Sequence, residues 1–328
     1  SRFFNNSLSF SFDWFKKDTK DMLMERPIPL YVGSGSPLSN VGTLTNQGIE
    51  LEVGYKLSVD KVNLSFLANA SYVKNEIKNL GNQTGYIDKE SLPTLGTVSR
   101  NQNGYPIGYF FGYKAIGVFQ TQEEIDNYIS PATGKPIQPN AVPGDTKFED
   151  LNGDGVISDD NEDRTMIGKP NPDWIVGLTV AADWNGFDLS AFFQGSFGAD
   201  VFDALRRYEL AAVNYTSDAL ERWTGPGTSN SMPRIVLGDT PKNFRPSTLL
   251  VHDASFLRLR NLQVGYTLPA QLTRKAYIQR LRFYASFDNL LTITGYKGMD
   301  PEIGSTMGID KGVYPQARVY TFGLNLTF

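Results

Sequence analysis

Apolar and polar residues alternate along much of the chain with the two-residue period of a β-strand. The clearest case is the C-terminal segment, where small or polar residues separate Tyr320, Phe322, Leu324, Leu326 and Phe328. Side chains alternate between the two faces of a strand, so each such segment has one apolar and one polar face. The same period recurs at residues 8–14, 49–57, 62–72, 174–184, 187–193, 256–266 and 281–287. The pattern predicts an all-β protein.

The segment 256–266 departs from a clean alternation. A strict two-residue period places Arg258 and Arg260 on the same face as Leu262, Val264 and Tyr266. The sequence therefore predicts two guanidinium groups on an otherwise apolar face.

Strand length and the positions of aromatic residues distinguish a membrane barrel from a soluble β-sandwich. Runs of about 10 to 12 residues, tilted by ~45°, rise about 25 Å, which is the height of an outer-membrane apolar band, whereas soluble strands usually have about 5 or 6 residues. Aromatic residues occur at strand ends, where the aromatic girdles of such barrels lie: Trp14, Trp174, Trp184, Tyr320 and Phe328. Both features favour a transmembrane antiparallel β-barrel.

The connections between strands alternate between short and long, which is the arrangement of outer-membrane barrels. Short turns are expected near Asp60 and Gly186, and the long connections 16–45, 75–173, 198–253 and 294–317 are expected outside the cell. Residues 104–120 are interpreted as a hairpin or a pair of strands within the second long connection. Residues 199–223 have helical spacing and predict a short loop helix over the barrel mouth.

Many positions on the polar faces are small, including Ser9, Ser65, Ser190 and Asn325. A barrel of eight to ten strands would need its interior filled by side chains, so small polar residues indicate a wider lumen. The chain also starts directly in a strand pattern, without a secretory signal. It is therefore interpreted as the C-terminal arc of a larger barrel whose other strands lie upstream.

Composition excludes several classes of function. The chain has 328 residues and a net charge of -4, from 31 basic and 35 acidic residues without long blocks of one sign, so no nucleic acid partner is expected. No cysteine is present, which excludes disulfides and thiolate chemistry, and no apolar run is long enough for a membrane helix. The single histidine, His252, lacks the partners of a catalytic triad and is interpreted as a strand-edge residue. No enzyme is expected.

The segment FEDLNGDGVISDDNEDRT, residues 148–165, carries a calcium-type pattern of oxygen donors. With Asp150 at position 1, Asn152 is at 3, Asp154 at 5, Gly155 at 6 and Val156 at 7, where a main-chain carbonyl binds in the EF-hand loop. Position 12 is Asn161 in place of the usual glutamate. The flanks contain turn and strand residues, so a helix-loop-helix sensor is not expected, and an acidic turn without metal remains the alternative.

Eight segments, in order, resemble the SusC/RagA family of TonB-dependent outer-membrane transporters of Bacteroidetes. They are NVGTLTNQGIELEVGY (40–55), GYPIGYFFGYKAIGVFQTQEEI (104–125), GDTKFEDLNGDGVI (144–157), IGKPNPDWIVGL (167–178), DLSAFFQGSFGADVF (188–202), LERWTGPGT (220–228), DASFLRLRNLQVGYTLP (253–269) and YKGMDPEI (296–303). The resemblance implies that residues 1–328 are the C-terminal part of a plugged barrel of roughly 22 strands. Residues 75–173 would be a long extracellular elaboration, and the plug domain would lie outside this chain.

The resemblance also implies a function, partners and a last calcium ligand. The function would be import of oligosaccharide or peptide across the outer membrane, with a SusD-like lipoprotein as lid and the TonB complex acting through the missing N-terminal part. Related transporters close the calcium-type loop with an aspartate just before Arg-Thr, which corresponds here to Asp163, with Asp159 or Glu162 as substitutes. The calcium ligands expected are thus Asp150, Asn152, Asp154, Val156 and Asp163. The competing hypothesis is a secreted soluble β protein that binds glycans through calcium-braced loops.

Overall fold

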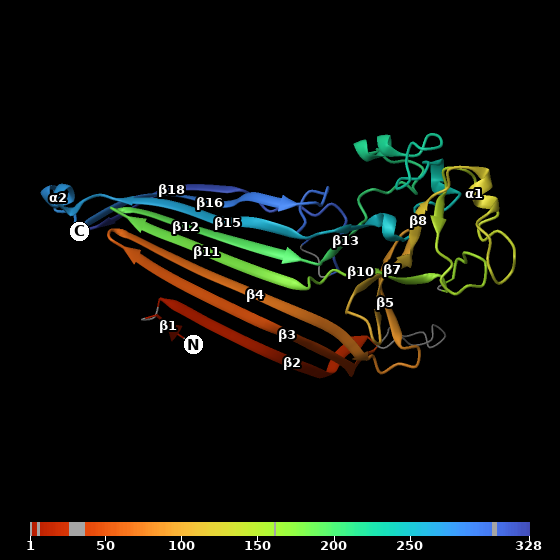
Figure 1. Ribbon diagram of the computed structural model, residues 1–328, viewed down its shortest axis with the longest axis horizontal. Coiled ribbons are helices and arrows are strands. Elements are labelled where there is room, and N and C mark those ends of the chain that lie inside the picture. The colour runs from red at the N-terminus through yellow and green to blue at the C-terminus, as the bar shows by residue number, and fades with distance from the viewer. Residues whose placement is uncertain (1, 5–6, 26–36, 161, 304–306) are drawn as a thin grey trace.

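The computed structural model describes residues 2–4, 7–25, 37–160, 162–303 and 307–328. Its largest element is an antiparallel sheet with the order β1-β2-β3-β4-β11-β12-β15-β16-β18, which we call the main sheet. Its long strands are the long arrows of Figure 1. The strands are β1 (Arg2–Phe3), β2 (Leu8–Glu25), β3 (Leu38–Val59), β4 (Val62–Asn79), β11 (Trp174–Trp184), β12 (Phe187–Phe197), β15 (Phe256–Thr267), β16 (Arg280–Thr294) and β18 (Val319–Thr327). The all-β fold class and the partial-barrel arc expected from the sequence are confirmed.

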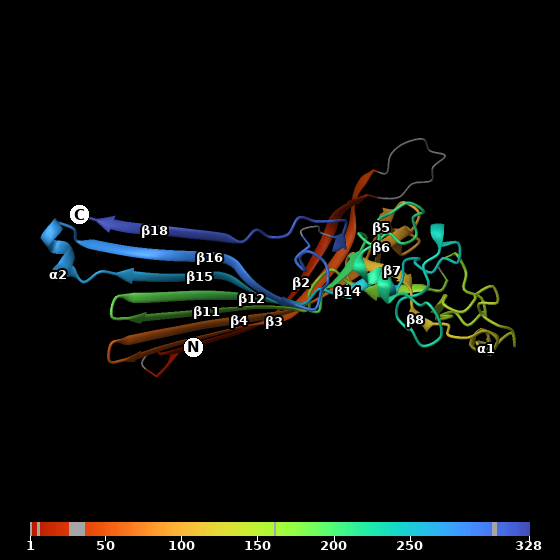
Figure 2. The same ribbon diagram turned by 90° about the horizontal axis from the view of Figure 1, so that it is seen from above.

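The main sheet has one end with short turns and one end with long connections, and we call these the short-turn end and the long-loop end (Figure 2). Asn185 and Gly186 join β11 to β12 with φ values of 47° and 88°, the pair of left-handed residues that a type I′ hairpin turn requires. Asp60 and Lys61 join β3 to β4. The first long connection is shorter than expected, because β2 continues to Glu25 and β3 already begins at Leu38.

The register of the main sheet keeps its two faces separate across neighbouring strands. An apolar row crosses it through Leu8, Tyr55, Phe66, Val180, Ala191, Leu262, Phe287 and Tyr320. The adjacent row, on the opposite face, runs through Ser65, Ala181, Ser190, Gln263, Ser286 and Thr321. Many large apolar side chains of the first face are exposed, as expected for a face that contacts lipid.

Aromatic side chains of neighbouring strands meet at both ends of the apolar face. The rings of Tyr72 and Trp174 lie 5.1 Å apart at the long-loop end. At the short-turn end, the centroid of Phe187 lies 6.3 Å from Trp184 and 4.4 Å from Tyr266. Aromatic groups at both ends of an apolar face are the arrangement of the two girdles of a membrane barrel.

A β-bulge in β15 corrects the expected position of two arginines. Phe193 faces Leu259 and Phe192 faces Asn261, so Arg260 is an additional residue on this strand. The bulge reverses the phase of the alternation, since Leu259 and Leu262 pair with Phe193 and Ala191, residues of one face. The prediction that Arg258 and Arg260 share a face with Leu262 was wrong, because a strict period cannot represent the extra residue.

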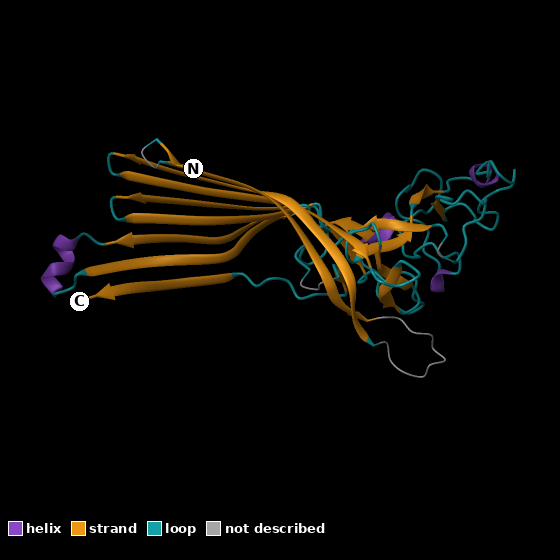
Figure 3. Ribbon diagram, turned by 90° about the horizontal axis from the view of Figure 1, so that it is seen from below, coloured by secondary structure: helices purple, strands orange, loops and turns teal. Residues whose placement is uncertain are grey.

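Three smaller sheets lie beyond the long-loop end, where Figure 3 shows their short strands in orange among teal loops. They are β10-β7-β6-β5, from β5 (Tyr86–Leu92), β6 (Gly96–Gln102), β7 (Tyr109–Tyr113) and β10 (Arg164–Gly168); β14-β13-β17, from β13 (Asp200–Asp203), β14 (Val251–Asp253) and β17 (Ile309–Asp310); and β8-β9, from β8 (Ala115–Val118) and β9 (Thr146–Phe148). Residues 104–120 therefore form a pair of strands, β7 in the four-stranded sheet and β8 in the two-stranded sheet, and not a hairpin.

Short helices occur at both ends of the main sheet. At the long-loop end they are α1 (Gln122–Asp126), η2 (Ser217–Glu221), η3 (Leu237–Asp239) and η4 (Thr248–Leu250). At the short-turn end they are α2 (Ala270–Thr273) and η5 (Arg274–Ala276). The helix expected over 199–223 was wrong. Asp200 to Asp203 pair with two other strands, and only the 3-10 turn η2 follows. In the described ranges, no helix is long and apolar enough to cross a membrane.

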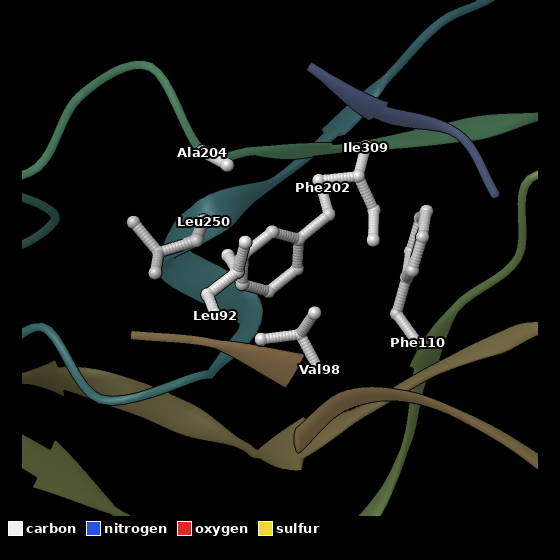
Figure 4. Packing of buried hydrophobic residues seen from close by; sticks show 7 residues of the cluster. All are labelled: Leu92, Val98, Phe110, Phe202, Ala204, Leu250 and Ile309. Carbon is white, nitrogen blue, oxygen red and sulfur yellow. The ribbon is translucent and has the colours of Figure 1, made fainter. Parts of the chain in front are cut away.

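A buried apolar cluster holds the three-stranded and four-stranded sheets together (Figure 4). Its members are Leu92, Val98, Phe110, Phe202, Ala204, Leu250 and Ile309. Phe110 and Phe202 are fully buried, and their rings lie 5.9 Å apart. The loop region thus has a core of its own, which fixes the segments that carry the candidate site.

Candidate functional site at the long-loop end

The calcium-type loop, residues 150–163, connects β9 to β10. Both oxygens of Asp150 accept backbone hydrogen bonds, from Gly153 N and from Gly155 N, each at 2.8 Å. Gly155 has φ of 88°, and a Cβ there would lie 2.8 Å from Cβ of Ser130. The sharp turn expected at position 6 of the loop therefore requires a glycine for both conformation and space.

The next predicted ligands lie on the same turn. Asn152 Oδ1 accepts a hydrogen bond from Asp154 N at 3.0 Å, and Asp154 Oδ1 accepts one from Val156 N at 2.8 Å. The side-chain amide of Asn152 donates to Asp154 Oδ2 at 3.0 Å and to Glu162 Oε2 at 3.1 Å. The structure thus brings Asp150, Asn152, Asp154 and the Val156 backbone together.

Asp163 closes the loop from its far end. Its side chain is 0 % exposed, and it accepts hydrogen bonds from Leu151 N at 3.1 Å and from Ser158 N at 2.9 Å. Leu151 directly follows Asp150, so the first and last predicted ligands are linked through one backbone segment. Between the two suggested substitutes for Asp163, Glu162 reaches the amide of Asn152, whereas Asp159 is paired with Lys242.

The donor set is of the kind that hard cations such as calcium prefer, since it consists of carboxylate, amide and carbonyl oxygens. Among the described residues, no group of three or more His, Cys, Asp or Glu side chains is arranged to hold a metal ion. A calcium ion would therefore depend on the oxygen of Asn152 and the carbonyl of Val156 as well as on carboxylates. Position 12, Asn161, lies outside the described residues.

The loop is attached to neighbouring strands by polar contacts. The hydroxyl of Tyr113 donates to the carbonyl of Ser158 at 2.7 Å, and Arg245 Nη1 lies 3.8 Å from Asp159 Oδ1. Lys242 also pairs with Asp159, and this hydrogen-bonded contact holds the pKa of the Asp159 carboxyl below its usual value. The second half of the loop is thus held from two sides.

An alternating stack of cations and rings, which we call the arginine ladder, continues from the loop into the four-stranded sheet. Arg100 lies 3.6 Å from the ring centroid of Phe111, and Arg164 lies 4.3 Å from the same ring. The order of the groups is Tyr86, Arg100, Phe111, Arg164, Tyr113, Arg245 and Phe148. Because Arg164 follows Asp163 in the chain, the ladder rigidly connects the end of the calcium-type loop to β5, β6 and β7. Nothing in the sequence indicated the ladder, whose arginines are far apart in the chain.

The aromatic side chains of residues 105–111 and Trp223 pack against the protein. Tyr109, Phe110 and Phe111 are buried, and Tyr105 stacks on Tyr109 with centroids 4.9 Å apart. Trp223 covers Gly144, where a Cβ would lie 2.4 Å from its ring, and donates through Nε1 to Gln120 at 3.2 Å. These rings stabilise the loop assembly.

Arg258 and Arg260 bind the connection between β16 and β18 to the polar face of the main sheet. Arg258 donates to Asp300 at 2.5 Å and to Glu302 at 3.1 Å, and Arg260 holds both oxygens of Glu302 at 2.7 Å. Arg258 is 2 % exposed on its side chain, so its charge is compensated almost entirely by these partners. The bulge in β15 is what allows both arginines to reach this face.

A mixed pocket of about 430 Å³ lies beside β13 and β14. Asp203, His252, Arg206, Asp218 and Lys297 line it together with apolar side chains. His252 belongs to β14, in agreement with the strand-edge interpretation, and its Nε2 lies 3.7 Å from Asp203 Oδ2.

Asp239 at the end of η3 predicts a pH dependence of this region. Its buried carboxyl accepts hydrogen bonds from Asn243 N at 2.9 Å and Phe244 N at 2.8 Å, yet burial outweighs them and raises its pKa to about 6. The folded-state pKa of Asp239 lies above its unfolded value of ~3.9. The contribution of Asp239 to the free energy of unfolding is therefore complete below pH ~3.9 and is lost as the pH rises through about 6. The expected loss is on the order of 3 kcal/mol for two pKa units.

Hydrogen exchange of the Asn243 and Phe244 amides in the full-length protein measures this effect. After correction for intrinsic exchange, protection should decrease between pH 4 and pH 7, and Asp239→Asn should remove most of the dependence. A pH profile that is the same in both proteins would contradict the assignment to Asp239.

Comparison with known proteins identifies the main sheet. The family model described as TonB dependent receptor-like, beta-barrel matches residues 1–290. The chain belongs to the TonB-dependent receptor-like β-barrel family. This result decides against the soluble β protein, because the two-faced sheet is a segment of a membrane barrel wall in this family.

Several named TonB-dependent receptors, SusC among them, are similar to this chain. It is 33% identical to TonB-dependent receptor P3 of Formosa agariphila and 29% identical to TonB-dependent receptor SusC of Bacteroides thetaiotaomicron, each over 99% of this chain. These matches cover 33% and 31% of those proteins. The chain therefore spans about a third of the length of its curated relatives, which are named as receptors and not as enzymes.

A solved structure confirms the same arc. The structure of the RagAB peptide transporter superposes with a TM-score of 0.78 at 28% sequence identity. The match covers 99% of this chain and 34% of the solved chain. The expected resemblance to SusC and RagA is thus confirmed in both sequence and fold.

Proposed function

We propose that this chain forms part of an outer-membrane importer of the SusC/RagA type, which takes up nutrients in a TonB-dependent manner. The main support is the register of the main sheet, which keeps an apolar face and a polar face separate over neighbouring strands. Such a sheet divides lipid from an aqueous lumen. Family membership over residues 1–290 supplies the connection to TonB-dependent uptake.

The substrate is proposed to be an oligosaccharide or a peptide. SusC and the RagAB peptide transporter are both relatives, and the latter is named for peptides. The long-loop end carries a folded assembly with its own cores, which suits the capture of a solute by rigid walls. A SusD-like lipoprotein is the proposed lid over this end, by analogy with those relatives.

The calcium-type loop is proposed to bind calcium and to brace the extracellular assembly. Asp150, Asn152, Asp154, the carbonyl of Val156 and Asp163 would hold the ion, which would supply fixed positive charge among the loop oxygens. The arginine ladder and Tyr113 attach this loop to the surrounding strands. Calcium would therefore stiffen the surface on which the lid and the substrate meet.

Uptake by the full-length protein tests the proposal. In the source organism, deletion of the gene should abolish uptake of one labelled class, either oligosaccharides or peptides, and the full-length gene should restore it. Uptake should also stop when the proton gradient that energises TonB is dissipated. Uptake of both classes at the wild-type rate in the deletion strain would contradict an import function.

A further inference from the structure

Three of the turns at the short-turn end, those that follow β3, β11 and β15, differ in length and charge. Two of them have two residues each, whereas residues 268–279 between β15 and β16 contain α2 and η5. This longest turn carries Arg274 and Lys275 and has no acidic residue. In Figure 1, α2 extends beyond the ends of the neighbouring strands. The feature is therefore a cationic projection at one end of the barrel wall.

Two large side chains of the turn 268–279 are exposed on its surface. Leu272 is 58% exposed and Tyr277 is 91% exposed. Tyr277 has φ of 57°, a left-handed conformation that is rare for a bulky residue. Within the described structure its ring is not buried, so internal packing does not explain the strain.

The base of the turn is continuous with the apolar face of the main sheet. Leu268 N donates to the carbonyl of Leu281 at 2.9 Å, and Gln279 N donates to the carbonyl of Thr327 at 2.8 Å. Two residues before Leu268, Tyr266 packs at 4.4 Å on Phe187 in the aromatic group of the short-turn end. The projection therefore starts where the lipid-contacting face ends.

We propose that residues 268–279 bind the phosphate headgroups of anionic lipids in the membrane leaflet at the short-turn end. Arg274 and Lys275 contact the phosphates, while Leu272 and Tyr277 enter the interface between headgroups and acyl chains. Charge complementarity and the continuity with the aromatic group favour a lipid surface over an acidic protein. Exposed tyrosine and leucine beside paired cations are typical of interfacial membrane contacts.

This inference relies on the membrane placement in the proposed function but not on transport. A full-length protein that binds anionic lipid as expected but imports nothing would contradict only the proposed import function. A full-length protein that imports but does not distinguish anionic from neutral lipid would contradict only this inference.

Lipid binding to the purified full-length protein tests the site. Native mass spectrometry in a neutral detergent should show tighter binding of phosphatidylglycerol than of phosphatidylcholine. The double variant Arg274→Gln, Lys275→Gln should weaken phosphatidylglycerol binding on the order of 30-fold, from about fivefold per charge. Lys61→Gln is the matched control, a cation in a two-residue turn of the same end, and should leave the affinity unchanged.

Two further measurements keep the inference falsifiable. Tyr277→Ala should reduce affinity for both lipids by a similar factor, because it removes an interfacial contact and no charge. Inorganic phosphate at millimolar concentration should not displace phosphatidylglycerol. Equal binding of the two lipids by the wild type, unchanged affinity in the double variant, or displacement by phosphate alone would overturn the proposal.

Discussion

Replacing Arg258 by alanine is expected to destabilise the long-loop end by about 3 to 5 kcal/mol, because it removes one partner of a buried ion pair. Asp300 is 6% exposed and would keep its charge without the guanidinium that lies 2.5 Å away. Thr292 and Glu302 also lose hydrogen bonds at 2.9 Å and 3.1 Å. The connection between β16 and β18 should then detach from the polar face.

Limited proteolysis and hydrogen exchange of residues 295–317 in the full-length protein measure this effect. Lys297→Ala is the control, since Lys297 is exposed and lies 4.0 Å from the exposed Glu221, a pair that should contribute at most about 1 kcal/mol. Arg258→Lys should rescue only part of the loss, because an ammonium cannot reproduce the planar fork of a guanidinium. Equal protection in Arg258→Ala and wild type would show that the pair does not hold the connection.

Replacing Asp150 and Asp154 by alanine is expected to abolish calcium binding by the calcium-type loop. The double variant removes two of the three carboxylates in the proposed donor set, and hard cations depend strongly on ligand charge. It also removes the acceptors for Gly153 N, Gly155 N and Val156 N. The loop should loosen and the affinity for lid or substrate should fall, while the barrel wall stays folded.

Elemental analysis after dialysis against calcium measures the bound metal, and a heat-dependent gel shift measures the integrity of the barrel. Asp160→Ala is the matched control, because it removes one exposed carboxylate of the same loop that is outside the donor set. Metal content that is equal in the double variant and the wild type would refute the site. Absence of calcium in the wild type would leave the loop as an acidic turn stabilised by its own hydrogen bonds.

The sequence predicts the barrel strands well because one physical requirement, an apolar and a polar face, acts at every residue of a spanning strand. The alternation over 174–184 matches β11 residue for residue. It fails at Arg260, where a bulge adds one residue, and at 16–25, where lysine and aspartate continue a strand beyond the alternating part. These segments are determined by pairing with neighbours, which a local pattern does not record.

The candidate site shows the same division. The spacing of Asp150, Asn152, Asp154 and Gly155 is local, so the turn that unites them could be predicted. The helix expected over 199–223 was wrong, since Val201 and Phe202 pair with strands distant in sequence. The arginine ladder is likewise a tertiary feature that no single segment encodes.

The open order of the main sheet has a consequence for the membrane. In the part of the chain that the structure describes, β18 has a strand partner on one side only, and no ladder among those residues satisfies the backbone amides and carbonyls of its other edge. Hydrocarbon offers such groups no hydrogen bonds, and each costs several kcal/mol when left unsatisfied there. A bilayer therefore accepts this wall only as part of a closed ring, and folding of the arc and closure of the barrel must be one thermodynamic event.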